Sequence, residues 1–207
     1  MGFYSRHIFP RVMDRVLGTR MISRERRVAL DPARGHVLEI GFGTGLNLPH
    51  YPSAVTKLTV IDSNQMLADR VARRVSEARV PVEEIRLDAS GRLPFEDASF
   101  DSVVTTFTLC SIDDVRSALQ EMRRVLRADG HFLFLEHGRS TDPRVAKRQD
   151  FFNPVQKLIG CGCNMNRAIG DLVSQCGFRI EKLDRYLMPD TPRMVGELYR
   201  GIASREA

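Results

Sequence analysis

A glycine-rich turn after a short apolar stretch constrains the fold more than any other feature of the chain. The sequence VLEIGFGTGLNLPHYP runs from residue 37 to residue 52 and places an acid, Glu39, two residues before the first of three glycines. Gly41, Gly43 and Gly45 tolerate positive φ and allow a ligand to approach the backbone closely. A helix that follows such a turn presents unpaired N–H groups to that ligand. The turn therefore predicts a buried strand that ends at a binding site.

The spacing of the glycines argues against a dinucleotide. Dinucleotide sites use G-x-G-x-x-G, in which the third glycine packs helix on strand and the helix N-terminus meets a pyrophosphate. Counted from Gly41, that third position is Leu46. Glu39 would repel a pyrophosphate, whereas it would attract a cationic ligand. An NAD-dependent oxidoreductase is therefore an alternative that the turn disfavours.

Two further acids follow the next predicted strands, residues 58–61 and 82–87. Asp62 comes directly after the first of these strands, and Asp88 directly after the second. In nucleotide-binding α/β folds, an acid in the position of Asp62 accepts hydrogen bonds from ribose hydroxyls. An acid in the position of Asp88 can accept from an exocyclic amine such as that of adenine. Three acids at consecutive strand ends line one edge of a parallel sheet and predict an adenosine ligand.

Strands and helices alternate from residue 36 onward. The expected parallel strands are residues 36–40, 58–61, 82–87, 100–106 and 131–138, with helices at 66–78 and 113–126 and a turn at Gly130. Two last strands, 178–187 and 195–203, are joined by MPDTPR, which is too short for a helical crossover, so this pair is expected to be antiparallel. The pattern predicts an α/β fold with a mostly parallel sheet and helices on both faces.

The N-terminal segment, residues 3–30, reads as one or two amphipathic helices, because Ile8, Val12 and Val16 recur at helical spacing. Much of the net charge of +5 comes from arginines in this segment, which either contact an anionic surface or form a solvated helix face. The sequence has no apolar run of 18 residues and no signal peptide pattern, so we expect a cytoplasmic protein.

The four cysteines do not suggest a metal site from their spacing. Cys161 and Cys163 are separated by one residue, too few for a C-x-x-C knuckle, and no histidine pair lies near them in the sequence. We therefore expect reduced thiols and no bound metal. Cys110 is expected to be a small buried side chain.

Together, these motifs resemble the class I S-adenosylmethionine-dependent methyltransferases, of the methyltransferase type 11-like kind. The matching stretches are EIGFGTG (residues 39–45, the first motif), VIDSNQML (60–67, the ribose segment), LDASGRLPFEDASFDSVV (87–104, the adenine-binding acid and fourth strand) and LQEMRRVLRADGHFLFLEH (119–137, the helix and fifth strand). The resemblance implies a Rossmann-like, seven-stranded, mostly parallel sheet with an antiparallel last strand.

The resemblance also implies the cofactor, S-adenosyl-L-methionine, and its product, S-adenosyl-L-homocysteine. In such a site Glu39 and the glycine turn hold the methionine part, Asp62 the ribose, and Asp88 with Ala89 the adenine. Met66 would pack near the adenine, although it also fits an ordinary core position. The implied cofactor-binding residues are Glu39, Gly41, Gly43, Gly45, Asn47, Asp62, Ser63, Met66, Asp88, Ala89 and Thr106.

His137 is the candidate catalytic residue. Methyl transfer from a sulfonium is an in-line displacement on an activated carbon, so positioning supplies much of the catalysis. An oxygen or thiol nucleophile still has to lose its proton. His137 ends the predicted fifth strand at the ligand edge, where it serves either as a general base or as a capping and packing residue.

Shorter stretches resemble two groups within the family. TLCSI (108–112), FLEHG (134–138) and GCN (162–164) are similar to animal alkyl-thiol methyltransferases, whereas FYSRHIFPRVMD (3–14) and GTGLNLPHYP (43–52) are similar to bacterial phospholipid methyltransferases. The animal enzymes carry a hydrophobic N-terminal membrane anchor that has no counterpart in residues 1–30. These resemblances imply a small-molecule acceptor: a thiol, an amine-bearing lipid head group or a quinone-like ring.

We predict a single methyltransferase domain over residues 1–207, with 1–30 as a helical lid, 35–138 as the cofactor-binding core and 139–207 as substrate-side helices with the C-terminal strand pair. A non-catalytic module that binds S-adenosylmethionine or a partner is the alternative, and the complete set of cofactor acids argues against it. Nucleic acid is disfavoured because the fourth strand leads into Thr106-Phe107-Thr108-Leu109 rather than an Asn-Pro-Pro-Tyr-type loop. Peripheral membrane contact through the basic N-terminal helix and the oligomeric state stay open.

Overall fold

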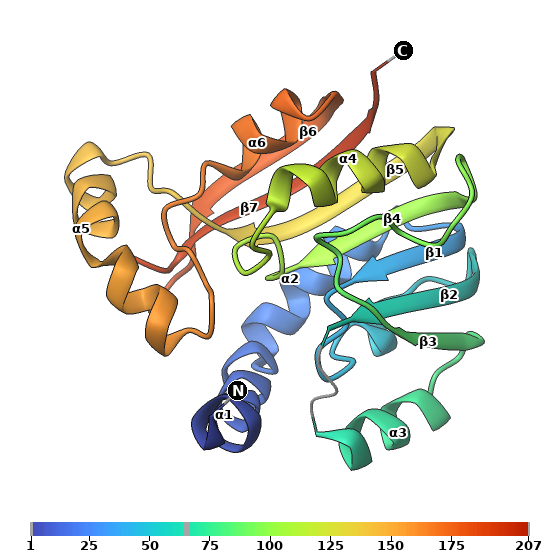
Figure 1. The fold of residues 1–207 in the computed structure, drawn as a ribbon, viewed down its shortest axis with the longest axis horizontal. Helices are drawn as coiled ribbons and strands as arrows, with labels where there is room; N and C mark the ends of the chain where they lie inside the picture. The colour runs from blue at the N-terminus through green and yellow to red at the C-terminus, as the bar shows by residue number, and fades with distance from the viewer. Residues whose placement is uncertain (1, 64–66, 207) are drawn as a thin grey trace.

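A computed structural model describes residues 2–63 and 67–206 as a central sheet flanked by helices (Figure 1). The strands are β1 (Gly35–Ile40), β2 (Val55–Asp62), β3 (Val82–Arg86), β4 (Phe100–Thr106), β5 (Leu126–His137), β6 (Phe178–Leu187) and β7 (Glu197–Arg205). The helices are η1 (Tyr4–Ile8), α1 (Phe9–Leu17), α2 (Arg20–Leu30), η2 (Leu48–His50), α3 (Ala68–Ser76), α4 (Val115–Val125), α5 (Pro143–Ile159) and α6 (Ile169–Gln175).

The sheet has the order β3-β2-β1-β4-β5-β7-β6. The pairs among β1 to β5 are parallel, and β7 runs antiparallel to both β5 and β6. This arrangement confirms the predicted seven-stranded, mostly parallel sheet with an antiparallel last strand. Strand β7 inserts between β5 and β6, and because residues 188–196 are too few for a helical crossover, β7 runs antiparallel to β6.

The two faces of the sheet carry separate apolar cores because alternate residues of a strand point to opposite faces. In β5, Phe132 and Phe134 pack with residues of α4 and α6, whereas Leu133 packs in the cluster that contains Leu30 of α2 and Val71 of α3. Figure 1 shows α4 and α6 in front of the sheet in that view. The expected helices on both faces are therefore present.

The described helices include none that is both long and apolar enough to cross a membrane. The N-terminal segment folds as η1, α1 and α2, as its helical periodicity predicts. Pro10 lies in the first turn of α1, where its missing N–H costs nothing. Gly18 separates α1 from α2, and a Cβ there would overlap the carbonyl oxygen of Asp14.

Gly130, which was expected to be a turn, lies in an irregular part of the fifth strand. It lies inside β5, which begins at Leu126 directly after α4, and Leu126 pairs with Phe100 across a register shift. A Cβ at Gly130 would lie 2.6 Å from Cδ1 of Leu126 and 2.9 Å from the carbonyl oxygen of Asp101. The same Cβ would lie 3.1 Å from the carbonyl oxygen of Arg127, whereas residues three apart in an extended strand are about 10 Å apart, so the chain turns between Arg127 and Gly130 as expected.

A tight contact between β5 and β7 yields a stability prediction. Gly201 pairs with Phe134, and an added Cβ would overlap the phenyl ring. We expect Gly201→Ala to lower the free energy of unfolding by about 1–3 kcal/mol, the usual cost of overpacking a core. Urea denaturation followed by circular dichroism measures this change.

The double variant Gly201→Ala with Phe134→Leu tests the cause. Because the smaller leucine makes room for the new methyl group, the two substitutions together should cost less than the sum of their separate costs. Additive costs would show that the ring is not what Gly201 accommodates.

Candidate functional site

The predicted site residues gather at one edge of the sheet, because the carboxyl ends of parallel strands meet there. Glu39 is the penultimate residue of β1, Asp62 the last of β2, Thr106 the last of β4 and His137 the last of β5. Asp88 follows the end of β3 by two residues. The edge therefore brings together residues that are up to 98 positions apart in the chain (from Glu39 to His137).

Glu39 is fully buried and lies at the centre of a hydrogen-bond network. Its two carboxylate oxygens accept hydrogen bonds from Nδ2 of Asn47 at 2.9 Å and from the hydroxyl of Tyr51 at 2.7 Å. Arg26 reaches in from α2 and donates from Nη1 to Oδ1 of Asn47 and to Oγ1 of Thr106, both at 2.7 Å. Asn47 and Thr106 were predicted site residues, whereas Arg26 and Tyr51 were missed.

Burial shifts the ionisation of this network. Desolvation raises the pKa of Glu39 to about 7, although the hydrogen bonds from Tyr51 and Asn47 and the charge of Arg26 act in the opposite direction. Desolvation likewise lowers the pKa of Arg26 to about 10, against the charge of Glu39. The guanidinium stays protonated at neutral pH, so the site pairs a buried cation with a carboxyl group that titrates near neutrality.

The glycine turn is fixed by its backbone conformation and by Asp62. Gly41, Gly43 and Gly45 have φ of +79°, +60° and +77°. A Cβ at Gly41 would overlap the side chain of Thr108, whereas the nearest heavy atom to a Cβ at Gly43 would be a backbone oxygen 4.0 Å away. The N–H of Gly43 donates to Oδ2 of Asp62 at 2.8 Å. Among residues 2–63 and 67–206, the turn therefore leaves open space beside Gly43, next to the carboxylate of Asp62.

The predicted adenine end is more exposed than the rest of the site. Asp88 lies on the surface, and its Oδ1 accepts a hydrogen bond from the N–H of Ser90 at 2.8 Å. Ala89 is buried, and Ser63 is exposed. Met66 lies outside the described residues, so its predicted packing near adenine stays a prediction.

The N-terminal helix α1 is tied to the glycine turn through Asp14, which sequence reasoning also missed. Oδ1 of this buried carboxylate accepts from Oγ1 of Thr44 at 2.6 Å and from Nη1 of Arg74 at 2.7 Å, and Oδ2 accepts from Arg70. Burial raises the pKa of Asp14, but the hydrogen bonds from Arg74 and Thr44 lower it more, so it ends below its ordinary value. The carboxylate therefore remains charged at neutral pH and joins α1 to the turn and to α3.

Next to the carboxyl end of β5, His137 lies in a cluster with two cysteines. Nε2 of His137 is 3.1 Å from Sγ of Cys163, and these two atoms and Sγ of Cys110 all lie within 4.8 Å of one another. Nδ1 of His137 is buried and has no partner among the described residues. Burial lowers the pKa of His137, but the hydrogen bond with Cys163 and the charges of Cys163 and Glu136 raise it more, so its pKa lies above the ordinary value.

Glu136, the residue before His137, holds the loop after β4. It is fully buried, and its carboxylate accepts a hydrogen bond from the backbone N–H of Thr108 at 2.9 Å. Burial raises the pKa of Glu136 to about 7, against the backbone hydrogen bonds from Leu109 and Thr108. This bond fixes the loop that carries Cys110 against the end of β5.

The raised pKa of Glu39 leads to a prediction about stability and pH. A raised folded-state pKa means that the folded protein holds a proton that the unfolded chain has released. The resulting stabilisation is complete below pH 4.5 and is lost as the pH rises through about 7. Thermal unfolding of the ligand-free protein should therefore show stability falling over this range by up to about 3 kcal/mol per group, for Glu39 and in the same sense for Glu136.

Glu39→Gln removes one of these two groups. We expect the decrease in stability between about pH 5 and pH 8 to become shallower in this variant, whatever its absolute stability. Glu84→Gln, on the exposed strand β3, should keep the wild-type slope. Equal slopes in wild type and Glu39→Gln would contradict the raised pKa of Glu39.

Comparison with known proteins adds to this geometry. Residues 38–134 match a family model described as a methyltransferase domain. The human thiol S-methyltransferase TMT1B is 37% identical over 134 residues, which cover 63% of this chain and 54% of that protein. The phosphatidylethanolamine N-methyltransferase of Cereibacter sphaeroides is 38% identical over 116 residues, covering 55% of this chain and 57% of that protein. The chain thus spans about half the length of these curated relatives.

Solved structures share the fold. The Burkholderia thailandensis 1,6-didemethyltoxoflavin-N1-methyltransferase, determined with 1,6-didemethyltoxoflavin and S-adenosylhomocysteine bound, superposes with a TM-score of 0.68 at 16% identity. The match covers 96% of this chain and 84% of that one, and at this identity it shows the likeness of the fold alone. Residues 38–134 thus match the methyltransferase domain in sequence, and the chain as a whole has the fold of the solved methyltransferase.

Proposed function

We propose that this protein transfers the methyl group of S-adenosylmethionine to a small thiol. One observation carries the proposal: Glu39, Asp62 and His137 all lie at the carboxyl ends of strands, along the same edge of the sheet. This edge would hold both the cofactor and a group that accepts a proton. The thiol is favoured because the stretches around Cys110, His137 and Cys163 are those similar to thiol methyltransferases. TMT1B, at 37% identity, is named as such an enzyme.

The residues present fit the cofactor. The open space beside Gly43 allows a ligand to approach the backbone, and the carboxylate of Asp62 lies next to it, where ribose hydroxyls would donate. The exposed carboxylate of Asp88 is available to an exocyclic amine. When bound, the cofactor supplies a methyl group on a positively charged sulfur, an activated carbon that needs no acid to release its leaving group.

Glu39 acts as an organiser of the methionine end. Because both of its oxygens already accept hydrogen bonds from protein donors, it orients Asn47 and Tyr51 and contributes negative charge near the turn. Arg26 completes the arrangement by holding Thr106 at the end of β4. The network presets the polar wall of the site before the ligand arrives, which lowers the ordering cost of binding.

His137 assists deprotonation of the acceptor. A thiol acceptor has to lose its proton before the sulfur attacks the methyl carbon, and Cys thiols ordinarily have a pKa near 8.5. His137 lies in a buried cluster of soft donor atoms beside the loop that follows β4. It assists the loss of the acceptor proton, after which the new sulfur–carbon bond forms as the sulfonium–carbon bond breaks.

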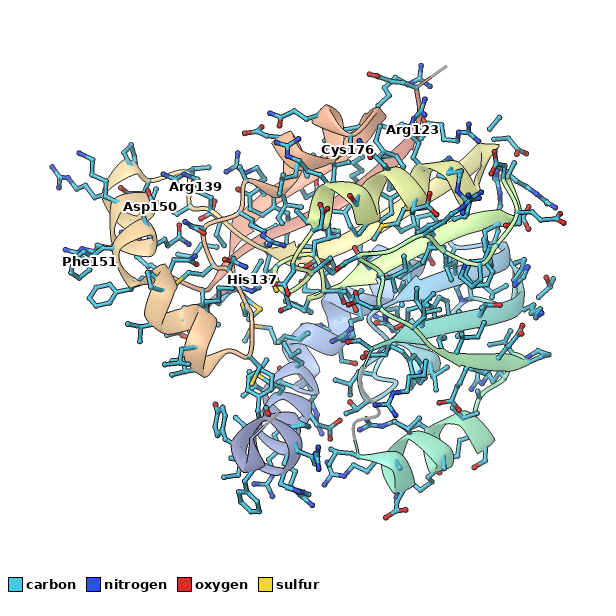
Figure 2. The ribbon with its side chains drawn as sticks, in the orientation of Figure 1. Arg123, His137, Arg139, Asp150, Phe151 and Cys176 are labelled. Carbon is cyan, nitrogen blue, oxygen red and sulfur yellow. The ribbon has the colours of Figure 1, made fainter. Side chains whose placement is uncertain are left out.

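A phospholipid head group is the second candidate acceptor, because η1 and α5 carry exposed apolar side chains of the kind that contact lipid. Phe151 and Leu158 of α5 are 77% and 80% exposed, and Phe3 is 73% exposed. The hydroxyl of Tyr4 donates to the carbonyl oxygen of Ile159 at 2.8 Å, which places η1 beside the end of α5. Figure 2 shows Phe151 on the side of α5 that faces away from the sheet.

This surface also supports peripheral membrane contact. Basic residues accompany the apolar ones on η1, α1 and α5: Arg6, Arg11, Arg15, Lys147, Arg148 and Lys157. Apolar side chains flanked by cations suit the interface of an anionic lipid layer. We propose a location in the cytoplasm, on or near the inner face of a membrane, where free thiols also stay reduced.

Cofactor binding gives a direct test of the site. We expect Asp62→Ala to weaken S-adenosylhomocysteine binding about tenfold to a hundredfold, because hydrogen bonds to a charged group contribute about 1.5–3 kcal/mol. Isothermal titration calorimetry measures the change. Glu84→Ala, an exposed acid of the neighbouring strand β3, should bind as the wild type does. Unchanged affinity in Asp62→Ala would show that the cofactor lies elsewhere.

The acceptor is tested by transfer of a labelled methyl group. With S-adenosylmethionine labelled at the methyl carbon, we expect label in a small alkyl thiol and little in phosphatidylethanolamine vesicles. His137→Ala should lower kcat about a hundredfold or more, within the usual range for loss of a group that removes a proton, while S-adenosylhomocysteine affinity stays close to the wild type. Label in the vesicles alone would favour the phospholipid, and label in neither would contradict the proposed function.

A further inference from the structure

We infer that Cys110, His137 and Cys163 form a zinc site. Their donor atoms, Sγ, Nε2 and Sγ, all lie within 4.8 Å of one another, and the three residues come from three separate segments of the chain. Thiolate sulfur and imidazole nitrogen are the ligands that Zn²⁺ prefers, and a set of two cysteines and one histidine leaves a fourth position open. Catalytic zinc sites have this composition, whereas structural sites use four protein ligands.

The distances suit a tetrahedral ion. With Zn–S of about 2.3 Å and Zn–N of about 2.0 Å, the donor atoms of such a site lie about 3.5–3.8 Å apart. His137 Nε2 and Cys163 Sγ are 3.1 Å apart, and no pair in the cluster exceeds 4.8 Å. Shifts of about 1 Å or less therefore bring all three donors to an ion in their centre.

The backbone holds Cys163 in place against Cys110. The backbone N–H and the side-chain Nδ2 of Asn164 both donate to the carbonyl oxygen of Cys110, at 2.8 and 3.0 Å. Arg167 donates to the carbonyl oxygen of Leu109. Two segments that are 53 residues apart (from Cys110 to Cys163) are thus fastened together at the point where their thiols face each other.

The segment before Cys163 adopts a strained conformation that this packing sustains. Cys161 has φ of +49°, and Gly162 has φ of +101°. A side chain other than glycine in the left-handed region costs about 1–3 kcal/mol and persists where the surroundings enforce it. The turn directs the Sγ of Cys163 towards His137 and leaves Cys161 exposed, so the two neighbouring cysteines differ in role.

The open fourth position on the ion explains how the acceptor thiol loses its proton, an inference that rests on the proposed function. An acceptor thiol that enters this position binds the ion through its sulfur and loses its proton to water, since a coordinating thiol is deprotonated outright. The thiolate sulfur then forms its bond to the methyl carbon as the sulfonium–carbon bond of the cofactor breaks. His137 then assists the loss of the acceptor proton as a ligand of the ion and not as a free base.

Metal analysis of the purified protein tests the site without any assay of activity. The full chain, expressed with added zinc and purified without chelator or polyhistidine tag, should contain one Zn²⁺ per chain by mass spectrometry. Replacement by Co²⁺ should produce thiolate-to-cobalt charge-transfer absorption and the visible bands of a tetrahedral ion. A folded wild-type protein that binds neither ion would overturn the inference.

Matched cysteine variants test which thiols hold the ion. Cys163→Ser and Cys110→Ser should lose the zinc and the charge-transfer bands. Cys161→Ser, two residues from Cys163 and exposed, and Cys176→Ser should keep both. Figure 2 shows Cys176 near Arg123, well apart from His137. Circular dichroism checks that each variant is folded. Because Cys110 is buried, Cys110→Ser can disturb the fold, and in that case Cys163→Ser alone tests whether the thiols bind zinc. Full zinc content in folded Cys163→Ser would contradict the site.

The zinc site and the proposed function can fail separately. Zinc bound as described, with no label transferred to any thiol, would refute the thiol acceptor and leave the metal site standing. Wild-type kcat towards a thiol in zinc-free Cys163→Ser, together with a loss of kcat in His137→Ala, would show a free histidine base and overturn the role of the ion. Loss of kcat in both variants, with unchanged S-adenosylhomocysteine affinity, is the expected result.

Discussion

A buried arginine connects the N-terminal helices to the ligand edge of the sheet. Moving a guanidinium out of water is costly unless it finds partners, and Arg26 obtains them from Asn47 and Thr106 and from the nearby charge of Glu39. Its guanidinium also lies 5.3 Å from the centroid of the Phe107 ring. These contacts provide partners for Nη1, whereas the buried Nε has none among the described residues. The same contacts fix the end of β4, so the position of α2 and the shape of the site depend on each other.

Two acids hold the N-terminal helices to other parts of the molecule. Asp14 ties α1 to the glycine turn and to α3, and Glu25 accepts from Arg200 of β7 at 2.7 Å and from the hydroxyl of Tyr186. Against an arginine-rich background, each acid of these helices makes a specific contact instead of a solvated one. A movement of the segment as a whole would leave buried charges unpaired, so these contacts hold α1 and α2 in place.

Much of the arrangement of the site residues could be predicted from short stretches of sequence. The residues that were missed share one property: their role depends on contacts with distant segments. Glu39, the glycine turn and Asp62 lie at the strand ends where they were expected, because a strand-end acid and a glycine turn can be recognised from a few adjacent residues. Arg26 and Tyr51 could not be recognised in this way, since an arginine on an amphipathic helix has the same sequence context whether it is solvated or buried against another element.

The cluster of Cys110, His137 and Cys163 could not be predicted from the spacing of these residues in the sequence. Metal knuckles are recognised by ligands a few residues apart, and Cys110, His137 and Cys163 have no such spacing. What joins them is topology: β4 and β5 are neighbours in the sheet, so the residues just beyond their ends meet, and Asn164 fastens the third segment to the loop after β4. A parallel sheet thus gathers soft donors at its carboxyl edge for the same reason that it gathers the acids of the cofactor site. The same structural rule thus places the proposed acceptor site and the proposed cofactor site along one edge of the sheet.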